Sequence, residues 1–284
     1  MKLLMVTKKA RKRHPFLEKA FKEKGFEVKN VDIKEVSLFS SRGKSRIEGP
    51  KLCLKKTKAV YLEAGLKLTQ FVEPLLDEIE RRGIYCQVKA GSHYVLSNEP
   101  LQTTTLNSFE VRMPRTFIFR SQGKVKILAN KLSYPALVKT FVKGEKTQRF
   151  IVDSPKALLS VADSVRHELD GIIVREFIEG DLDQCAVIGD KVYSIQRKFQ
   201  KDAIQPAKKA KMSSLSAKDR ETAIHAARIC GCDIATVKMC KGYVLKVKPL
   251  VDFVLFNKKT GADLFKDVAE LFAQKTGFKG VESP

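Results

Sequence analysis

The sequence predicts an α/β protein with an open parallel N-terminal lobe and antiparallel hairpins in its second half. Two observations support this class. The first 31 residues hold an apolar run, a helical pattern and a second apolar run, the order of a β-α-β unit in a parallel sheet. The second half holds paired segments of alternating apolar and polar residues joined by turn residues, which is typical of antiparallel hairpins.

The N-terminal elements follow from local patterns. The apolar run 2–7 indicates a buried strand, and a helix is expected over 15–24 because Gly25 follows it. The stretch 37–50 is rich in Ser, Gly, Arg and Lys, so it predicts a mobile loop. The apolar periodicity around Leu75 predicts an amphipathic helix over 68–82. Further strands are expected at 26–31, 59–63 and 84–88.

The later elements are predicted in the same way. A connecting helix is expected near 99–109, a further helix over 155–168, and a hairpin over 185–197. Strands are also expected at 115–120, 124–128, 136–139, 150–153 and 172–176, and helices near 216–230 and 261–276.

The segment 237–248 is the most informative feature of the chain. Apolar and polar residues alternate on both sides of Lys241-Gly242, which predicts a hairpin with one buried face. The alternation places Lys238, Lys246 and Lys248 on one face. That face would attract phosphate, although an ordinary solvated strand face is the alternative.

Several segments resemble, in order and spacing, the RimK-like branch of the ATP-grasp enzymes, over roughly residues 90–275. Tyr134-Pro-Ala-Leu-Val-Lys139 resembles the strand whose lysine contacts nucleotide phosphates, and Ile172-Ile-Val-Arg-Glu-Phe-Ile-Glu-Gly180 resembles the hinge that holds adenine. The hairpin that ends at Arg197 resembles one whose arginine contacts phosphate. The resemblance implies an ATP-grasp fold of two α+β subdomains behind the N-terminal lobe, with domains at 1–92, 93–170 and 171–284. Enzymes of this branch join a carboxylate to an amine through an acylphosphate made from ATP. The resemblance also implies nucleotide-binding residues at Lys139, Glu176, Phe177, Ile178, Asp181 and Arg197.

The chain departs from this family where the metal would bind. The family has Asp, Glu and Asn at the positions of Lys238, Lys246 and Lys248. Magnesium prefers oxygen ligands, and ammonium groups repel it. We therefore expect ATP or ADP as the only cofactor, with no metal, and we assign no catalytic residue from the sequence.

The net charge predicts a polyanionic partner. A formal charge of +22 favours a nucleic acid or ribonucleoprotein, with an acidic protein tail as an alternative; no membrane anchor is apparent, and the oligomeric state stays open. The expected polyanion-binding residues are Lys8, Lys9, Arg11, Lys12, Arg13, Lys198, Lys201, Lys208, Lys209, Lys211, Lys238, Lys246 and Lys248.

The six cysteines indicate a reducing, cytoplasmic location. They have no C-x-x-C spacing and no histidine in ligand register, so a zinc site is not expected. No signal peptide and no long apolar run are apparent.

Three functions are compatible with these observations. The first is a catalytically degenerate RimK-like protein that binds RNA, ribosomes or another nucleic-acid assembly. The alternative is an active ATP-dependent carboxylate–amine ligase that acts on an acidic substrate, and the third is a nucleotide sensor. The lysines could also pair with an internal carboxylate, such as Glu176 or Asp252, instead of an external phosphate.

Overall fold

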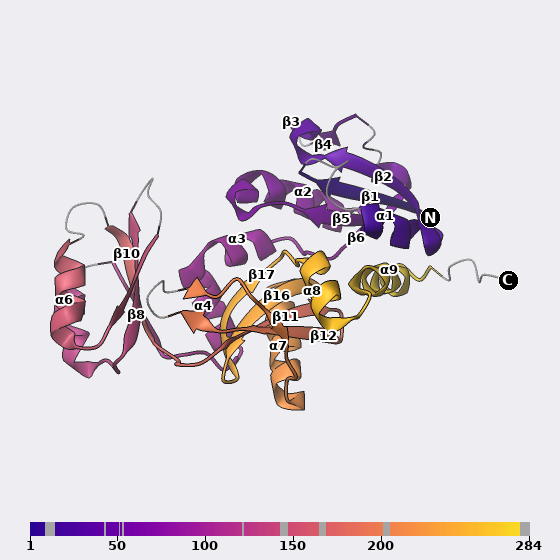
Figure 1. Ribbon diagram of the computed structural model, residues 1–284. Helices are drawn as coiled ribbons and strands as arrows, with labels where there is room; N and C mark the ends of the chain where they lie inside the picture. Colours follow the sequence, from indigo (N-terminus) through magenta and orange to yellow (C-terminus); the bar gives the residue numbers. More distant parts are fainter. Residues whose placement is uncertain are drawn as a thin grey trace.

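The computed structural model contains three main β-sheets, each accompanied by helices (Figure 1). They follow one another along the chain, in agreement with the predicted α/β class. One short arm projects from the first sheet. The structure describes residues 1–8, 15–42, 44–50, 52, 54–120, 122–142, 147–164, 169–200 and 205–278.

The N-terminal sheet is parallel, with strand order β2-β1-β5-β6. The two central strands, β1 and β5, carry nearly continuous apolar runs, as expected for a parallel sheet covered by helices, whereas the edge strand β2 alternates apolar and polar residues. Thr7 and Glu63 are paired at the carboxyl ends of adjacent strands, where open sheets of this type bind ligands. The elements are β1 Lys2–Thr7, α1 Pro15–Glu23, β2 Glu27–Asp32, β5 Thr57–Glu63, α2 Thr69–Arg81 and β6 Tyr85–Cys86.

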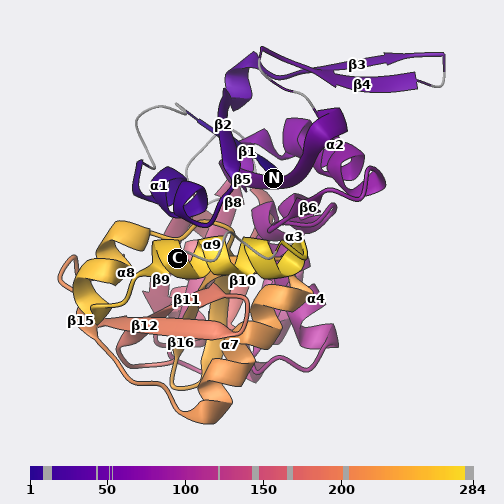
Figure 2. The same cartoon turned by 90° about the vertical axis from the view of Figure 1, so that its right-hand side faces the viewer.

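The prediction of a mobile loop over 37–50 is wrong. Strands β3 (Ser37–Ser41) and β4 (Lys44–Glu48) form an antiparallel arm that extends away from the sheet (Figure 2). Every residue of β3 is exposed, so neither face shows the apolar alternation by which a strand is recognised. Arg46 covers the Phe39 ring at 4.9 Å.

The central sheet is antiparallel, with strand order β7-β10-β8-β9. A strand predicted at 124–128 is wrong, because this segment lies in a helix. Its short apolar run fits either structure, and the helix directs Val125 into the core. The elements are β7 Thr116–Phe119, α5 Gln122–Leu128, β8 Ala136–Val142, β9 Gln148–Val152, α6 Pro155–Ser164 and β10 Leu169–Glu176. The domain boundary proposed between residues 170 and 171 falls within β10.

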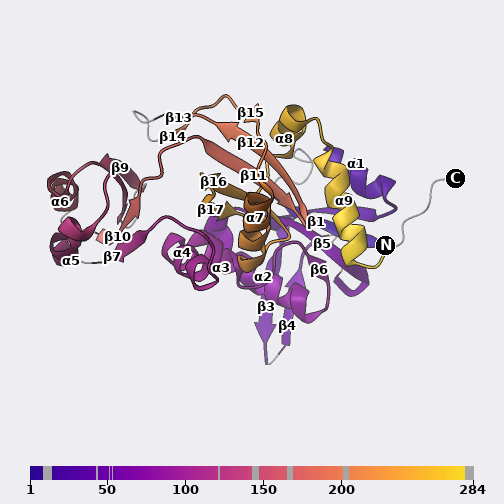
Figure 3. The same cartoon turned by 90° about the horizontal axis from the view of Figure 1, so that it is seen from below.

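The C-terminal sheet is antiparallel, with strand order β15-β12-β11-β16-β17. Helices α1 and α9 pack together and join this lobe to the N-terminal lobe (Figure 3). The strands are β11 Leu182–Ile188, β12 Lys191–Arg197, β15 Lys211–Met212, β16 Ile234–Cys240 and β17 Tyr243–Lys248, beside the short pair β13 Phe199–Gln200 and β14 Gln205–Pro206. The helices are α3 Ser92–Ser97, α4 Glu99–Ser108, α7 Ala217–Ile229, α8 Phe253–Thr260 and α9 Leu264–Lys275.

Short 3₁₀ turns complete the elements. They lie at Ile33–Glu35, Leu54–Lys56, Leu66–Leu68 and Ala129–Lys131. Within the described residues, no helix is long and apolar enough to cross a membrane.

The N-terminal and C-terminal lobes share hydrophobic cores, whereas the central lobe does not. Two cores each combine residues of the N-terminal and C-terminal lobes; Leu4 and Val237 share one, and Phe21 and Phe272 share the other. The buried members of the third core lie between Phe119 and Val174, within the central sheet and its helices. The central lobe therefore has a core of its own.

Candidate active site between the central and C-terminal lobes

A first cavity of about 160 Å³ lies between the central and C-terminal sheets. Residues from β8 and β10 line one side, and residues from the β16–β17 hairpin line the other. Its full lining is Leu137, Lys139, Arg149, Arg175, Glu176, Phe177, Ile178, Gly180, Leu182, Phe199, Lys238, Cys240, Leu245 and Lys246.

The cavity has an apolar end beside the segment that follows β10. The rings of Phe177 and Phe199 lie 5.4 Å apart there. The backbone amide of Phe177 donates to Pro135 at 3.0 Å, and that of Glu176 donates to Arg115 at 2.9 Å. These bonds fix the connection between the lobes, and the apolar surface beside it suits a flat aromatic ring.

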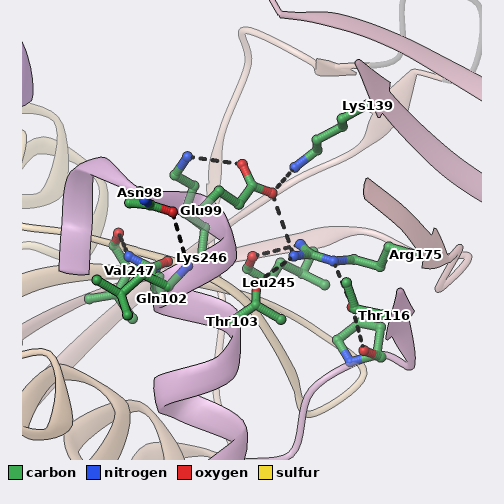
Figure 4. Close-up of polar contacts among 12 residues, drawn as sticks. Asn98, Glu99, Gln102, Thr103, Thr116, Lys139, Arg175, Leu245, Lys246 and Val247 are labelled. Atoms are coloured by element: carbon green, nitrogen blue, oxygen red, sulfur yellow. Dashed lines mark hydrogen bonds and ion pairs between the residues drawn. The ribbon is translucent and has the colours of Figure 1, made fainter. Parts of the chain in front are cut away.

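Three cations that line the cavity come from different strands and surround the carboxylate of Glu99 (Figure 4). Lys139 of β8 donates to Glu99, Lys246 of β17 lies 3.4 Å from it, and Arg175 of β10 lies 3.5 Å away. Glu99 follows the N-cap Asn98, whose side chain accepts from the Leu101 amide. The start of α4 thereby places one carboxylate among three positive charges.

Further hydrogen bonds hold this cation cluster in place. Arg175 is almost fully buried; it donates to the Leu245 carbonyl at 3.0 Å and to the hydroxyls of Thr103 and Thr116, each at 3.2 Å. Gln102 exchanges two hydrogen bonds with the Val247 backbone, at 3.0 and 3.1 Å. Helix α4 is therefore attached to β17, next to the cations that it pairs with.

The charges of the buried pair are set by burial and by the neighbouring ions. Burial alone would raise the pKa of Glu99, but Lys139, Lys246 and Arg175 together lower it to about 2. Burial lowers the pKa of Lys139 to about 8, although Glu99 acts in the opposite direction. Both groups are charged at neutral pH, and three positive charges face one negative charge.

The β16–β17 hairpin carries the three lysines on one face, as the alternation predicts. Lys238 pairs directly across from Lys246, and Thr236 pairs across from Lys248. Burial, followed by repulsion from Lys248 and Lys246, lowers the pKa of Lys238 to about 8. Burial and repulsion from Lys246 and Arg149 also lower the pKa of Lys248.

The lysines of the hairpin differ in their partners. Lys246 pairs with Glu99, which is neither of the internal carboxylates considered from the sequence. Within the described residues, no carboxylate forms an ion pair with Lys238 or Lys248. These two ammonium groups are partly buried and repel one another.

The residues of this site do not fit a magnesium ion. Magnesium takes oxygen ligands, and the corresponding positions of the hairpin hold ammonium groups. Within the described residues, no group of three or more His, Cys, Asp or Glu side chains could hold a metal ion.

The structure brings together most, but not all, of the residues predicted to bind nucleotide. Lys139, Glu176, Phe177 and Ile178 line the first cavity. Asp181 and Arg197 do not line it. Arg197 donates to the carbonyls of Ala207 and Lys208, at 3.0 and 2.5 Å, and so holds the loop after β12.

The expected polyanion-binding residues are dispersed. Lys8 is exposed at the end of β1, far along the chain from the exposed Lys198, Lys208, Lys209 and Lys211. Lys238, Lys246 and Lys248 gather on the hairpin. Lys9, Arg11, Lys12, Arg13 and Lys201 lie outside the described residues.

Sequence reasoning missed Glu99, Arg149 and Arg175. Arg175 lies inside the apolar hinge strand, where a lone charged residue is itself a signal of a buried partner. Glu99 follows a helix-capping Asn, and an acidic residue is common in the first turn of a helix, so its position gives no sign of the distant cations. Arg149 lies on an edge strand and carries no local signal.

A second cavity, of about 530 Å³, adjoins the first at Lys238, which lines both. It extends from Glu63, at the end of β5, to α8. Its full lining is Glu63, Gln184, Thr236, Lys238, Lys248, Leu250, Val251, Asp252, Phe253, Val254, Phe256 and Phe265.

A cleft between two antiparallel sheets, behind a parallel N-terminal lobe, defines the ATP-grasp class. A model of the RimK-like ATP-grasp domain matches residues 87–272. The chain belongs to this family, in agreement with the resemblance.

Similar proteins are named as ligases. A probable alpha-L-glutamate ligase of Haemophilus influenzae is 21% identical over 75% of this chain and 74% of its own length. Another, of Vibrio atlanticus, is 24% identical over 84% of this chain and 81% of its own. The ATP-grasp ligase PsnB, complexed with its minimal precursor, shares the fold with a TM-score of 0.71 at 15% identity, covering 96% of this chain and 98% of that one. A RimK domain ATP-grasp protein from Sphaerobacter thermophilus has a TM-score of 0.67 at 17% identity, covering 95% and 99%.

These comparisons correct the first functional hypothesis. The expectation of a catalytically degenerate protein that binds nucleic acid is wrong, because the family and its named relatives are ligases. They favour the alternative, an active carboxylate–amine ligase. The lysines of the hairpin therefore need an explanation within ligase chemistry.

Proposed function

We propose that this chain is an ATP-dependent carboxylate–amine ligase whose lysines, in place of a metal, neutralise the nucleotide phosphates. The observation that carries the proposal is the excess of positive charge at one end of the first cavity. Lys139, Lys246 and Arg175 face the single carboxylate of Glu99, and Lys238 lies on the same hairpin. Such a site gains electrostatic free energy when a polyanion binds.

The lining of the first cavity combines an apolar surface, which suits adenine, with lysines, which suit the phosphates. The adenine ring would lie against Phe177, Ile178 and Phe199, and the phosphates would extend toward Lys139 and Lys238. At about 160 Å³ the cavity is smaller than the roughly 300 Å³ at which ligand pockets begin, so the lobes would separate to admit ATP.

The proposed reaction has two steps. A carboxylate oxygen of the substrate attacks the γ-phosphorus, an O–P bond forms, and the bond to the bridging oxygen breaks as ADP leaves with the electron pair. An amine nitrogen then attacks the acyl carbon, a C–N bond forms, and phosphate leaves while the amine loses a proton to solvent. Positioning and charge neutralisation are the main contributions of a protein to such transfers, and Lys139, Lys238 and Lys246 would supply the charge.

Calorimetric titration with ATP tests the phosphate site. We expect ATP to bind in EDTA at least as tightly as in excess Mg²⁺, because the cation would reduce the negative charge that the lysines recognise. Binding that requires Mg²⁺ would show that the lysines do not replace a metal.

Turnover tests the ligase itself. ADP release should require a carboxylate and an amine, and L-glutamate is the first amine to supply because the relatives are named for it. Lys246→Ala should lower kcat/KM by about 100-fold, as for the loss of one transition-state contact, whereas Lys246→Arg should retain part of the activity. Lys258→Ala, on the exposed side of α8, is the matched control. ATP binding without any ADP release, across a panel of carboxylates and amines, would refute the ligase.

The cysteines support a reducing location for this enzyme. Cys86, Cys185, Cys230, Cys232 and Cys240 are free thiols, four of them buried. We propose the cytoplasm as the compartment in which it acts.

A further inference from the structure

The second cavity has a polar end and an apolar body. Lys238 and Lys248 form its polar end, and Lys238 also lines the first cavity. An anion held by these two lysines would therefore lie next to the phosphates of a nucleotide in the first cavity. This inference rests on the proposed function, because it concerns the substrate of that same reaction.

The body of the cavity is lined by apolar side chains of α8 and its flanks. The rings of Phe253 and Phe265 are tilted and lie 5.6 Å apart, and the ring of Phe16 of α1 stacks on Phe265 at 5.7 Å. Leu250 and Val254 are 40% and 63% exposed, although both are apolar. Exposed apolar side chains that line a cavity of this size commonly mark a ligand site.

The acidic residues of the cavity restrict the charge of its occupant. Glu63 and Asp252 also line it, and Asp252 caps α8 by accepting from the Leu255 amide at 3.1 Å. The Asp252 carboxylate would repel a second negative charge on the ligand. The lining thus combines two cations, an aromatic wall and two carboxylates.

We propose that the second cavity binds the carboxylate that the enzyme activates, and that this substrate is a monocarboxylate with an apolar body. Its carboxylate lies on Lys248 and Lys238, and its apolar body lies against Phe253, Phe265 and Val254. One oxygen of that carboxylate attacks the γ-phosphorus across Lys238, and ADP leaves, as described above. L-glutamate, with its second carboxylate, is the amine of the reaction and not the occupant of this cavity.

Three probes of similar size separate the requirements of the cavity. The first probe, N-acetyl-L-phenylalanine, has one carboxylate and an apolar body. The second is the amide of this compound, N-acetyl-L-phenylalaninamide, which lacks the charge. The third, N-acetyl-L-glutamate, has a second carboxylate in place of the ring. Calorimetry on the full chain with saturating ADP should show N-acetyl-L-phenylalanine binding about tenfold more tightly than either comparator, which corresponds to one charged contact.

Two substitutions locate the binding. Lys248→Gln should weaken binding of N-acetyl-L-phenylalanine by about tenfold. Val254→Asp, at an exposed position that tolerates a polar side chain in folding, should weaken it by a similar factor because it places a charge in the apolar wall. Lys258→Gln should leave binding unchanged. Equal binding of the three probes, or full binding by both substituted proteins, would overturn the proposal.

Failure of this cavity assignment can be distinguished from failure of the ligase proposal. Glutamate-dependent ADP release without measurable binding of N-acetyl-L-phenylalanine would overturn only the assignment of this cavity. Selective binding of that probe without any ADP release would support the assignment and refute the ligase.

Discussion

The carboxylate of Glu99 determines the charge state of the first cavity. It pairs with Lys139 and Lys246, two of the cations that we expect to contact phosphate, and it is itself nearly buried at 11% side-chain exposure. A carboxylate and a phosphate compete for the same donors. Glu99 therefore stabilises the folded protein and, in the same contacts, opposes nucleotide binding.

Glu99→Gln separates these two effects. Loss of the charge leaves Lys139, Lys246 and Arg175 without their carboxylate, so we expect the free energy of unfolding to fall by about 3 kcal/mol. The affinity for metal-free ATP should rise by about tenfold, because the competing anion is removed. Denaturant unfolding and calorimetry measure the two quantities. Glu221→Gln, an exposed carboxylate on α7, should change neither. Weaker ATP binding by Glu99→Gln would show that the carboxylate assists the nucleotide instead of opposing it.

Lys238 makes nucleotide binding depend on pH. Its pKa, lowered to about 8 by burial and by Lys248 and Lys246, should rise when a phosphate binds beside it. At pH 8 ATP binding should therefore take up a fraction of a proton, and the affinity should fall as the pH rises above 8. Calorimetry in buffers of different ionisation enthalpy measures this uptake. Lys238→Gln should reduce it, and Lys139, whose pKa is also lowered to about 8, should account for the remainder. Uptake that is unchanged in this variant would assign the proton to another group.

The same pKa predicts a change in stability with the opposite sign. The unfolded chain keeps the Lys238 proton up to about pH 10.5, whereas the folded chain releases it near pH 8. The unfolded state thus binds more protons between these values, and the free energy of unfolding should rise with pH in that window. If the free energy of unfolding rises and the ATP affinity falls over the same pH range, the titrating group is a cation that repels its neighbours until an anion binds.

At the scale of elements, the helices and strands predicted from the sequence are those whose apolar residues recur at regular spacing because one face is buried. The β16–β17 hairpin was predicted because its apolar face packs in a core and Lys241-Gly242 forms its turn, with positive φ at both residues. The β3–β4 arm and α5 were missed for the opposite reason. All of β3 is exposed, and the apolar run in α5 is too short to distinguish a helix from a strand.

The candidate site was predictable only in its local parts. The hinge residues Glu176 to Ile178 and the lysine face of the hairpin follow from single segments of the sequence. Glu99 and its partners come from α4, β8, β10 and β17, and no local pattern brings four elements together. The second cavity likewise combines the end of β5 with α8, two elements that are almost 200 residues apart in the sequence.

At the scale of the whole molecule, the three lobes form two packing units. The N-terminal and C-terminal lobes share both of their hydrophobic cores, whereas the core of the central lobe is built from its own segment. Polar contacts of Lys139 and Arg175 with Glu99, Thr103 and Leu245 join the central lobe to the rest beside the first cavity. A nucleotide in that cavity would contact both units at once.

This arrangement predicts two transitions in calorimetric unfolding of the free protein, with the central lobe unfolding separately from the other two. Metal-free ATP at about 100 times its Kd should stabilise the unit that binds it by about 2.7 kcal/mol and raise the Tm of the central lobe by about 10 °C or more. The two transitions should then approach one another, because unfolding of either unit must release the nucleotide. Inorganic phosphate at the same ionic strength is the control, since it lacks the adenine that contacts Phe177 and Phe199. A single transition without nucleotide would mean that the polar contacts around Glu99 couple the lobes as strongly as a shared core does.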